Sequence, residues 1–425
     1  MKNIFVLGAD AFNLAQMREL PGAQDYRFHE LFTHADVKAG PAIPVQKLHD
    51  GALEQLHAFE GSIDAIVGYW DFPVSTLLPL LCRTFGLPSP SFEATLKCEH
   101  KFWSRLEQQQ VIPDFIPPFC AVDPFADNPR SQITLDYPFW IKPVKAASSH
   151  LAFRVDGDSS LEHALKRIRA SIYRFAEPFN YLLDFAELPA SVASVDGHHC
   201  IAEGVISRGR QCTLEGYVYQ GEVQVYGAVD SIRQGRHRSS FARYQYPSRI
   251  PRRVQQRMHA ITDRFLTHIG FDNGPFNIEF YWDNQCDRLW LLEINTRISK
   301  SHCPLFRAVD GASHHKVMLD LSLGQRPAFP HRQGTWPCAA KFMWRLYEDA
   351  MVKRIPSAAE IEAIRTRFPG TEIQLHIQPG MRLSELRDQD SYSYEIAVIF
   401  AGGQSQTELL EKYRAIQRAL RLEFE

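Results

Sequence analysis

Residues 274–301 read GPFNIEFYWDNQCDRLWLLEINTRISKS, and this stretch contains two strand-like runs separated by a polar turn. The runs are residues 277–281 and 289–294, and the Asp-Asn-Gln sequence between them predicts a β-hairpin. A carboxylate ends the apolar alternation of each run, Glu279 in the first and Glu293 in the second. The hairpin therefore brings two acidic side chains into neighbouring strands.

The polar residues of this hairpin are expected to share one face. Side chains two residues apart in a strand point to the same side, so Glu293, Asn295 and Arg297 form a row. Two carboxylates and an amide oxygen suit Mg²⁺, which prefers oxygen ligands and shares them with nucleotide phosphates. We predict Glu279, Glu293 and Asn295 as metal ligands and Arg297 as a bidentate partner for a phosphoryl or carboxylate group. The alternative is a surface hairpin with solvated charges, and the apolar Leu-Trp-Leu-Leu at 289–292 speaks against it.

The pattern resembles the metal-binding end of the ATP-grasp superfamily, in which a Glu, a second Glu and an Asn two residues later hold the Mg²⁺ of Mg-ATP. The resemblance implies an α/β and α+β fold in three parts. These are a Rossmann-like domain at residues 1–92, an ATP-grasp core at 93–330 with a mobile subdomain at about 137–215, and a small C-terminal α+β domain at 331–425.

Composition and charge describe an ordinary globular protein. The chain has 425 residues, 45% of them hydrophobic, which is enough for two or three domains. Its formal net charge of −2 gives no indication of a nucleic-acid or anionic-membrane partner. The 8 cysteines form no C-x-x-C pair, and no run reaches the roughly 18 apolar residues of a membrane span. We therefore expect a cytoplasmic protein without a zinc cluster, disulfide framework or membrane span.

The N-terminal segment alternates strand and helix patterns. Residues 2–7 and 63–67 read as buried strands, and residues 12–20 and 74–85 read as helices. This order predicts a small doubly wound α/β domain. The turn after the first strand, Gly-Ala-Asp, lacks the glycine fingerprint of a dinucleotide site. In the ATP-grasp family such a domain precedes the nucleotide site and often helps to hold the acceptor substrate.

Two lysines match the family's ATP lysines. Residues 93–110 predict one helix that carries Lys101, and the sequence around it is similar to the family helix whose lysine reaches the ATP phosphates. Lys142 ends the apolar strand of residues 137–142, where an ammonium group needs an anionic partner. The resemblance assigns Lys142 to the α-phosphate.

The resemblance also implies contacts around the nucleotide. The family covers the phosphates with a glycine-rich loop, but the corresponding residues 145–150 contain no glycine, so Ser148, Ser149 and His150 are expected to replace some backbone contacts. The family's adenine hinge corresponds to Glu203 and the backbone at Val205. Glu215 occupies the position of an acidic residue near the ribose or the metal.

Residues 231–253 carry seven arginines: Arg233, Arg236, Arg238, Arg243, Arg249, Arg252 and Arg253. We interpret the stretch as a loop that faces phosphate or carboxylate, with solvated arginines as the alternative. Residues 254–269 predict a helix, and residues 324–337 predict a linker rich in Pro and Gly. The C-terminal part predicts strands at 339–346 and 394–400 and a final helix capped by a Ser-x-x-Glu box.

The ordered set of family motifs favours an ATP-dependent carboxylate–amine ligase that works through an acylphosphate, with amino acids among its expected substrates. ATP and Mg²⁺ are the implied cofactors, Mn²⁺ is an alternative metal, and a homodimer is an expectation from the family. A bicarbonate-activating carboxylase and a non-catalytic ATP-binding protein remain alternatives. The carboxylase branch has a glutamate shortly after the motif's arginine, whereas residues 298–302 here contain no carboxylate. Lys300, protonated near neutral pH, is expected to help Arg297 bind an anionic substrate.

Overall fold

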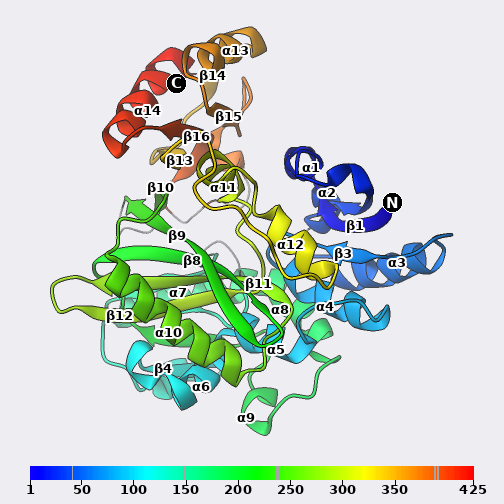
Figure 1. Cartoon of the computed structure of the whole chain (residues 1–425). Helices are drawn as coiled ribbons and strands as arrows, with labels where there is room; N and C mark the ends of the chain where they lie inside the picture. Colours follow the sequence, from blue (N-terminus) through cyan, green and yellow to red (C-terminus); the bar gives the residue numbers. More distant parts are fainter. Residues whose placement is uncertain (41, 147–149, 236–239, 387–388, 390–391) are drawn as a thin grey trace.

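The computed structural model describes residues 1–425 except 41, 147–149, 236–239, 387–388 and 390–391. Its N-terminal part is a parallel sheet with the order β2-β1-β3 and helices around it (Figure 1). The doubly wound α/β pattern is thereby confirmed as a parallel N-terminal sheet. The elements are β1 (Lys2–Ala9), α1 (Ala11–Arg18), β2 (Tyr26–Thr33), α2 (His34–Val37), α3 (Val45–His57), β3 (Ala65–Val67) and α4 (Val74–Thr84).

The single helix predicted at 93–110 is wrong, because the structure has two helices, α5 (Phe92–Glu99) and α6 (Lys101–Val111), separated at His100. The buried His100 ring caps α6, since its Nδ1 accepts from the backbone N–H of Trp103 at 3.3 Å. Its Nε2 donates to the Val195 carbonyl at 2.7 Å. This break makes Lys101 the first residue of α6.

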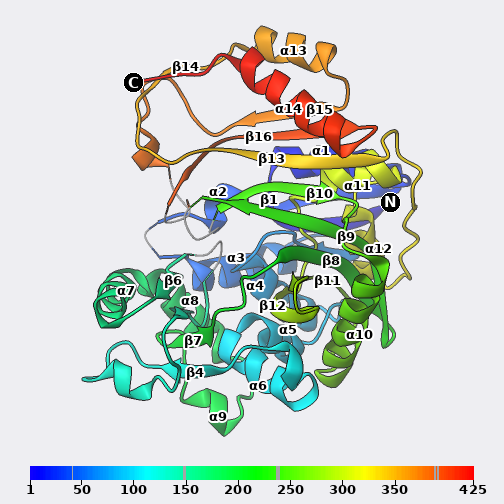
Figure 2. The ribbon, with the colours of Figure 1, turned by 90° about the vertical axis from the view of Figure 1, so that its left-hand side faces the viewer.

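A second sheet has the antiparallel order β4-β7-β5-β6 and lies at the lower left of Figure 2, beside α7 and α8. Phe139 and Ile141 are fully buried in the core that α7 covers, so Lys142 projects from the other face of the sheet. The elements are β4 (Phe119–Val122), β5 (Phe139–Pro143), β6 (Phe153–Val155), α7 (Asp158–Ser171), α8 (Tyr173–Leu183), α9 (Ala190–Ala193) and β7 (Cys200–Gly204).

A long antiparallel sheet has the order β12-β11-β8-β9-β10-β13-β16-β15, and Figure 2 shows its strands rising from the core into the C-terminal part. It contains the predicted hairpin, and α10 packs on one face (Figure 1). The elements from the core are β8 (Arg210–Tyr219), β9 (Glu222–Gln234), β10 (Ser240–Tyr246), α10 (Arg252–His268), β11 (Gly274–Asp283), β12 (Arg288–Asn295), α11 (Cys303–Asp310) and α12 (His315–Ser322).

The C-terminal part continues this sheet, because β13 pairs with β10 from Arg243 opposite Phe342 to Tyr246 opposite Ala339. Of the predicted capping box, the Ser405 half is present, with its side chain accepting from the N–H of Glu408, whereas the Glu408 side chain accepts from the N–H of Gln404 at 2.8 Å. The elements are β13 (Cys338–Leu346), β14 (Val352–Arg354), α13 (Ala358–Arg367), β15 (Thr371–Leu375), β16 (Tyr394–Gly403), α14 (Gln406–Leu420) and β17 (Glu423–Phe424).

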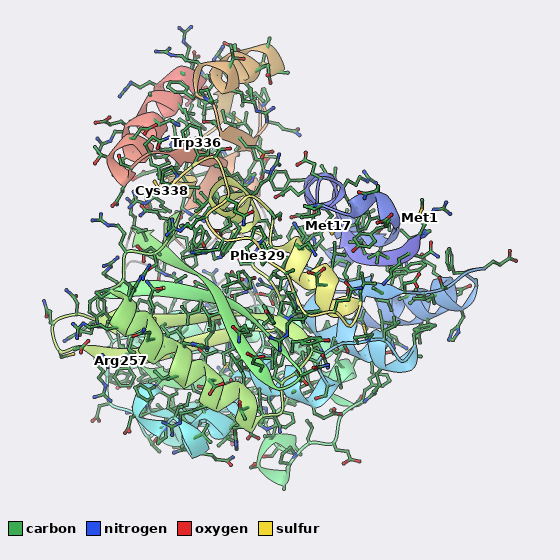
Figure 3. The ribbon with its side chains drawn as sticks, in the orientation of Figure 1. Met1, Met17, Arg257, Phe329, Trp336 and Cys338 are labelled. Atoms are coloured by element: carbon green, nitrogen blue, oxygen red, sulfur yellow. The ribbon has the colours of Figure 1, made fainter. Side chains whose placement is uncertain are left out.

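The connector at 324–337 is tied to both parts of the chain that it joins. Phe329, labelled in Figure 3, lies 5.1 Å from Tyr226 and 5.9 Å from Phe306 between ring centroids. Trp336, also labelled there, lies under the Lys412 ammonium at 4.5 Å. The connector is therefore packed, and the predicted domain boundaries at 92/93 and 330/331 stay predictions.

The interpretation of residues 231–253 as one loop is wrong, because the described part of this stretch contains the end of β9, the strand β10 and the start of α10. β9 extends to Gln234 and β10 begins at Ser240, and Arg236 and Arg238 lie outside the described residues.

Across the described parts of the chain, no helix combines the length and apolar character that crossing a membrane requires.

Candidate active site

Segments from all parts of the chain line one cavity of about 570 Å³ between the sheets. Its walls come from the loop after β3, the start of α6, β5, β7, the hairpin β11–β12 and β13. The predicted site residues that line it are Lys101, Lys142, His150, Glu203, Glu279, Glu293, Asn295, Arg297 and Lys300. The structure thus gathers residues that are separated by up to two hundred positions in the sequence.

Strand alternation places the acidic pair in the cavity. On β11, Ile278 and Phe280 are fully buried beneath α10, so Asn277 and Glu279 face the cavity. Glu279 lies directly opposite Glu293 in the strand pairing. The prediction that the hairpin brings these carboxylates together is confirmed.

A β-bulge determines which side chains of β12 point into the cavity. Leu291 is buried on the α10 side, yet Glu293, two residues later, lines the cavity. The register shifts at this point, with Phe280 opposite Leu291 and Glu279 opposite Glu293, so Leu292 is the extra residue. The extra residue turns Glu293 and Asn295 to the other face.

The acidic pair has the chemistry of a divalent-cation site. Burial, and next the facing Glu293, raises the pKa of Glu279 to about 7. Two facing carboxylates in a buried site repel each other unless one is protonated or a cation lies between them, and a hard divalent cation accepts oxygen ligands from both. The described residues at this point therefore fit a magnesium ion.

Asn277 orients the amide of this site. Its Nδ2 donates to the Arg297 carbonyl at 3.0 Å, and its Oδ1 accepts from Asn295 Nδ2 at 2.9 Å. With its amide N–H group committed, Asn295 can offer Oδ1 as a ligand. Asn277 was not among the predicted site residues, although its spacing of two residues from Glu279 was a usable signal.

Lysine side chains gather in the same cavity. Lys101 Nζ donates to the Ala146 carbonyl at 3.1 Å. Burial lowers the pKa of Lys101 to about 8, with Glu293 opposing that shift and the charges of Lys145 and Lys142 adding to it. Several ammonium groups in one buried place favour a polyanionic ligand.

Lys142 has a protein partner in addition to its place in the cavity. Its Nζ lies 2.5 Å from Glu203 Oε2, and Arg105 Nε donates to Glu203 Oε1 at 2.6 Å. Although burial opposes it, the charges of Arg105 and Lys142 lower the pKa of Glu203 to about 2. Arg105 also donates to the Leu292 carbonyl at 2.7 Å, so it joins α6 to the bulge of β12.

Arg297 is positioned by Asp71, in the loop after β3. Its Nη2 donates to Asp71 Oδ2 at 3.0 Å. Against the effect of burial, Arg297 and Lys145 hold the pKa of Asp71 well below its usual range. Lys145 also pairs with Glu99, whose Oε1 accepts from Thr296 at 3.0 Å. This network fixes the segment between the hairpin and Lys300.

Of the described residues predicted for the site, Val205 and Glu215 do not line the cavity, whereas Gly204 and Ile206 beside Val205 do. Glu215 pairs in register with Asn277, but it is fully buried, and its Oε1 lies 2.7 Å from His302 Nδ1. Burial raises its pKa to about 7. The segment after Arg297 therefore covers Glu215. Ser148 and Ser149 lie outside the described residues.

Several cavity residues were not predicted from the sequence because their partners are distant in the chain. Asp71 follows the buried strand β3, and polar residues at the carboxyl ends of parallel strands are a usable signal. Lys341 is the only charged residue among positions 338–344 of β13, a second such signal. Glu99 and Arg105 offered no comparable pattern, whereas Arg233, which also lines the cavity, belongs to the arginine-rich stretch that was predicted to face phosphate or carboxylate.

Comparisons with known proteins agree with this geometry. Residues 135–303 match the family model described as ATP-grasp domain. The L-amino acid ligase from Bacillus licheniformis is 16% identical, with 100% of this chain and 99% of that chain covered and a TM-score of 0.72. The biotin carboxylase from Campylobacter jejuni is 14% identical, with 99% and 92% covered and a TM-score of 0.65.

Phosphoribosylglycinamide synthetase from Anaerococcus prevotii is 12% identical, with 100% of each chain covered and a TM-score of 0.63. At such identities these likenesses show the fold alone. A comparison with curated protein sequences found no significant match. Residues 135–303 are therefore an ATP-grasp domain, and the chain has the ATP-grasp fold along its whole length.

Proposed function

We propose that the chain is an ADP-forming carboxylate–amine ligase that joins amino acids or similar acids to an amine. The observation that carries this proposal is one cavity with three features: the facing carboxylates Glu279 and Glu293, the ammonium groups of Lys101 and Lys142, and the guanidinium of Arg297. The likeness to an L-amino acid ligase adds support at the level of fold.

The proposed reaction has two steps. A carboxylate oxygen of the acid forms a bond to the γ-phosphorus of ATP, and the bond from that phosphorus to the β,γ-bridging oxygen breaks, which releases ADP. The amine nitrogen then forms a bond to the acyl carbon of the acylphosphate, phosphate leaves, and the amine loses a proton. The residues contribute mainly position and charge in such a phosphoryl transfer.

Each group has a role that its place supports. Lys101 and Lys142 bind phosphate oxygens, and Arg297 holds the carboxylate or the transferring phosphoryl group. Glu279, Glu293 and Asn295 would hold a divalent cation, which when bound neutralises charge on the phosphates. The carboxylase branch has a glutamate shortly after the motif's arginine, whereas residues 298–302 of this chain contain no carboxylate.

The test intercepts the acylphosphate with hydroxylamine. Protein, Mg-ATP, hydroxylamine and single acids from a set of amino acids and small dicarboxylates are mixed without bicarbonate or biotin. We expect a hydroxamate and an equal amount of ADP with at least one acid. Dependence of ADP release on bicarbonate, with no hydroxamate from any acid, would favour a carboxylase. ATP binding without ADP release in any mixture would favour a non-catalytic protein.

Removing Lys142 should weaken nucleotide binding. In Lys142→Met, the loss of a charged contact to phosphate should raise the Kd of ATP about tenfold or more. Glu203 keeps Arg105 as a partner, so we expect only a small change in thermal stability. Calorimetry measures the affinity, and Lys166→Met on the exposed face of α7 is the matched control. An unchanged Kd in Lys142→Met would remove this lysine from the phosphate site.

A further inference from the structure

One end of the cavity holds two ammonium groups that the proposed chemistry does not use together. The residues that line this end of the cavity include Trp70, Tyr244, Lys300, Ser301 and Lys341. Lys300 Nζ lies 3.8 Å from the centroid of the Trp70 ring. Lys341 Nζ donates to Ser301 Oγ at 2.9 Å and lies 5.8 Å from the Tyr244 ring. The C-terminal part of the chain thus delivers a second lysine beside the segment that follows Arg297.

Neither ammonium group forms an ion pair within 4.0 Å with a carboxylate of the described residues, although both lysines are at least half-buried. The carboxylates that act most strongly on the two lysines, Asp10 on Lys300 and Glu395 on Lys341, already have other partners in the chain. Asp10 caps α1 by accepting from the N–H of Asn13 at 3.0 Å. Glu395 pairs with Arg345 at 2.7 Å.

The charge of Lys341 also acts on Lys300. Burial, followed by the charge of Lys341, lowers the pKa of Lys300 to about 7. Burial likewise lowers the pKa of Lys341. Two like charges in a partly buried place are unfavourable unless an anion lies between them. An ammonium group has three donors, and Lys341 uses one of them on Ser301.

We propose that Lys300 and Lys341 bind a second anionic group of the acid substrate, a carboxylate or a phosphate, distinct from the carboxylate that Arg297 holds. The inference rests on the proposed function, because it names the class of acid that the same cavity accepts. Under the proposed function, the reacting carboxylate lies at the end with Glu293 and Asn295, where the nucleotide phosphates would be held. The group at Lys300 and Lys341 is then the other end of the acid, with the Trp70 ring beside it.

The test compares acids of similar size that differ in one charge: aspartate with asparagine, glutamate with glutamine, and O-phosphoserine with serine. In the hydroxamate assay, we expect the charged member of at least one pair to have the higher kcat/KM. In Lys341→Gln the preference should fall about tenfold, the value of one charged hydrogen bond. The first two pairs report a carboxylate and the third reports a phosphate.

Lys353→Gln is the matched control, since Lys353 lies on β14 with 53% of its side chain exposed and should leave the preference unchanged. The inference is overturned if the native chain prefers the neutral members, or if Lys341→Gln lowers both members of each pair equally.

A second measurement separates this inference from the proposed ligase activity. Calorimetry without ATP, at fixed ionic strength, measures binding of the same six compounds to the native chain and to Lys341→Gln. Binding of charged members that Lys341→Gln weakens, together with no hydroxamate, would support the anion site and refute the ligase. Hydroxamate formation without any preference for charge, together with equal binding of both members, would support the ligase and refute the anion site.

Discussion

Replacing Glu293 with glutamine is expected to lower ADP release by about two orders of magnitude or more, the loss that follows from removing a major electrostatic element of an active site. Glutamine keeps the shape of the side chain but removes a charge from the pair that faces Glu279. The facing Glu293 carboxylate helps to raise the pKa of Glu279, so its removal also relieves a repulsion in the metal-free protein. We therefore expect the Tm of the variant, without metal, to be equal to or above that of the native chain.

Asp283→Asn is the control for this substitution. Asp283 lies at the end of β11 in the same hairpin, outside the cavity lining, and its removal should leave ADP release within about twofold, as for most surface changes. ADP release and Tm are measured side by side for both variants. Normal ADP release by Glu293→Gln would show that the hairpin serves structure alone.

Replacing Arg105 with methionine is expected to destabilise the chain by about 3 kcal/mol, the lower part of the range for breaking a buried ion pair. Arg105 and Glu203 expose only 4% and 6% of their side chains. The variant leaves Glu203 with Lys142 alone and removes the donor to the Leu292 carbonyl. The remaining Lys142 contact is the reason for a value at the lower part of the range.

The midpoint of urea unfolding measures this effect. Arg253→Met is the matched control, because Arg253 is 71% exposed on α10 and should change stability by less than about 0.5 kcal/mol. The double variant Arg105→Met/Glu203→Gln should recover part of the loss, since it removes the carboxylate that lost its partner. An Arg105→Met chain that unfolds at the native midpoint would mean that the Glu203 carboxylate is satisfied by Lys142.

Local patterns in the sequence predicted the hairpin and its acidic pair because both depend on alternation over a few residues. Glu279 and Glu293 face each other as expected. The bulge at Leu292 was not predictable, because an extra residue changes which side chains face the core without changing the apolar pattern. The same limit applies to His100, whose capping contact with Val195 joins residues far apart in the chain.

Glu215 shows that strand alternation alone does not predict whether a side chain reaches the cavity. It lies on the cavity side of the long sheet, opposite Asn277, as strand periodicity allows. Whether such a residue meets a ligand depends on which segment covers it. Here His302 and the Ser299 backbone cover Glu215. A covering segment that comes more than eighty residues later has no signature in the strand itself. The sequence carried a signal for Asp71 and for Lys341 individually, but it gave no sign that they meet Arg297 and Lys300.

The pairing of β10 with β13 limits how this chain can be inherited or recombined. The family match ends at residue 303, yet the hydrogen-bonding edge of β10 is satisfied by a strand that begins at residue 338. A shorter chain would leave that edge open to pairing with other molecules. It would also lack Lys341. A gene exchange that replaced the C-terminal part would therefore have to supply a strand that pairs with β10 and a cationic side chain at the place of Lys341.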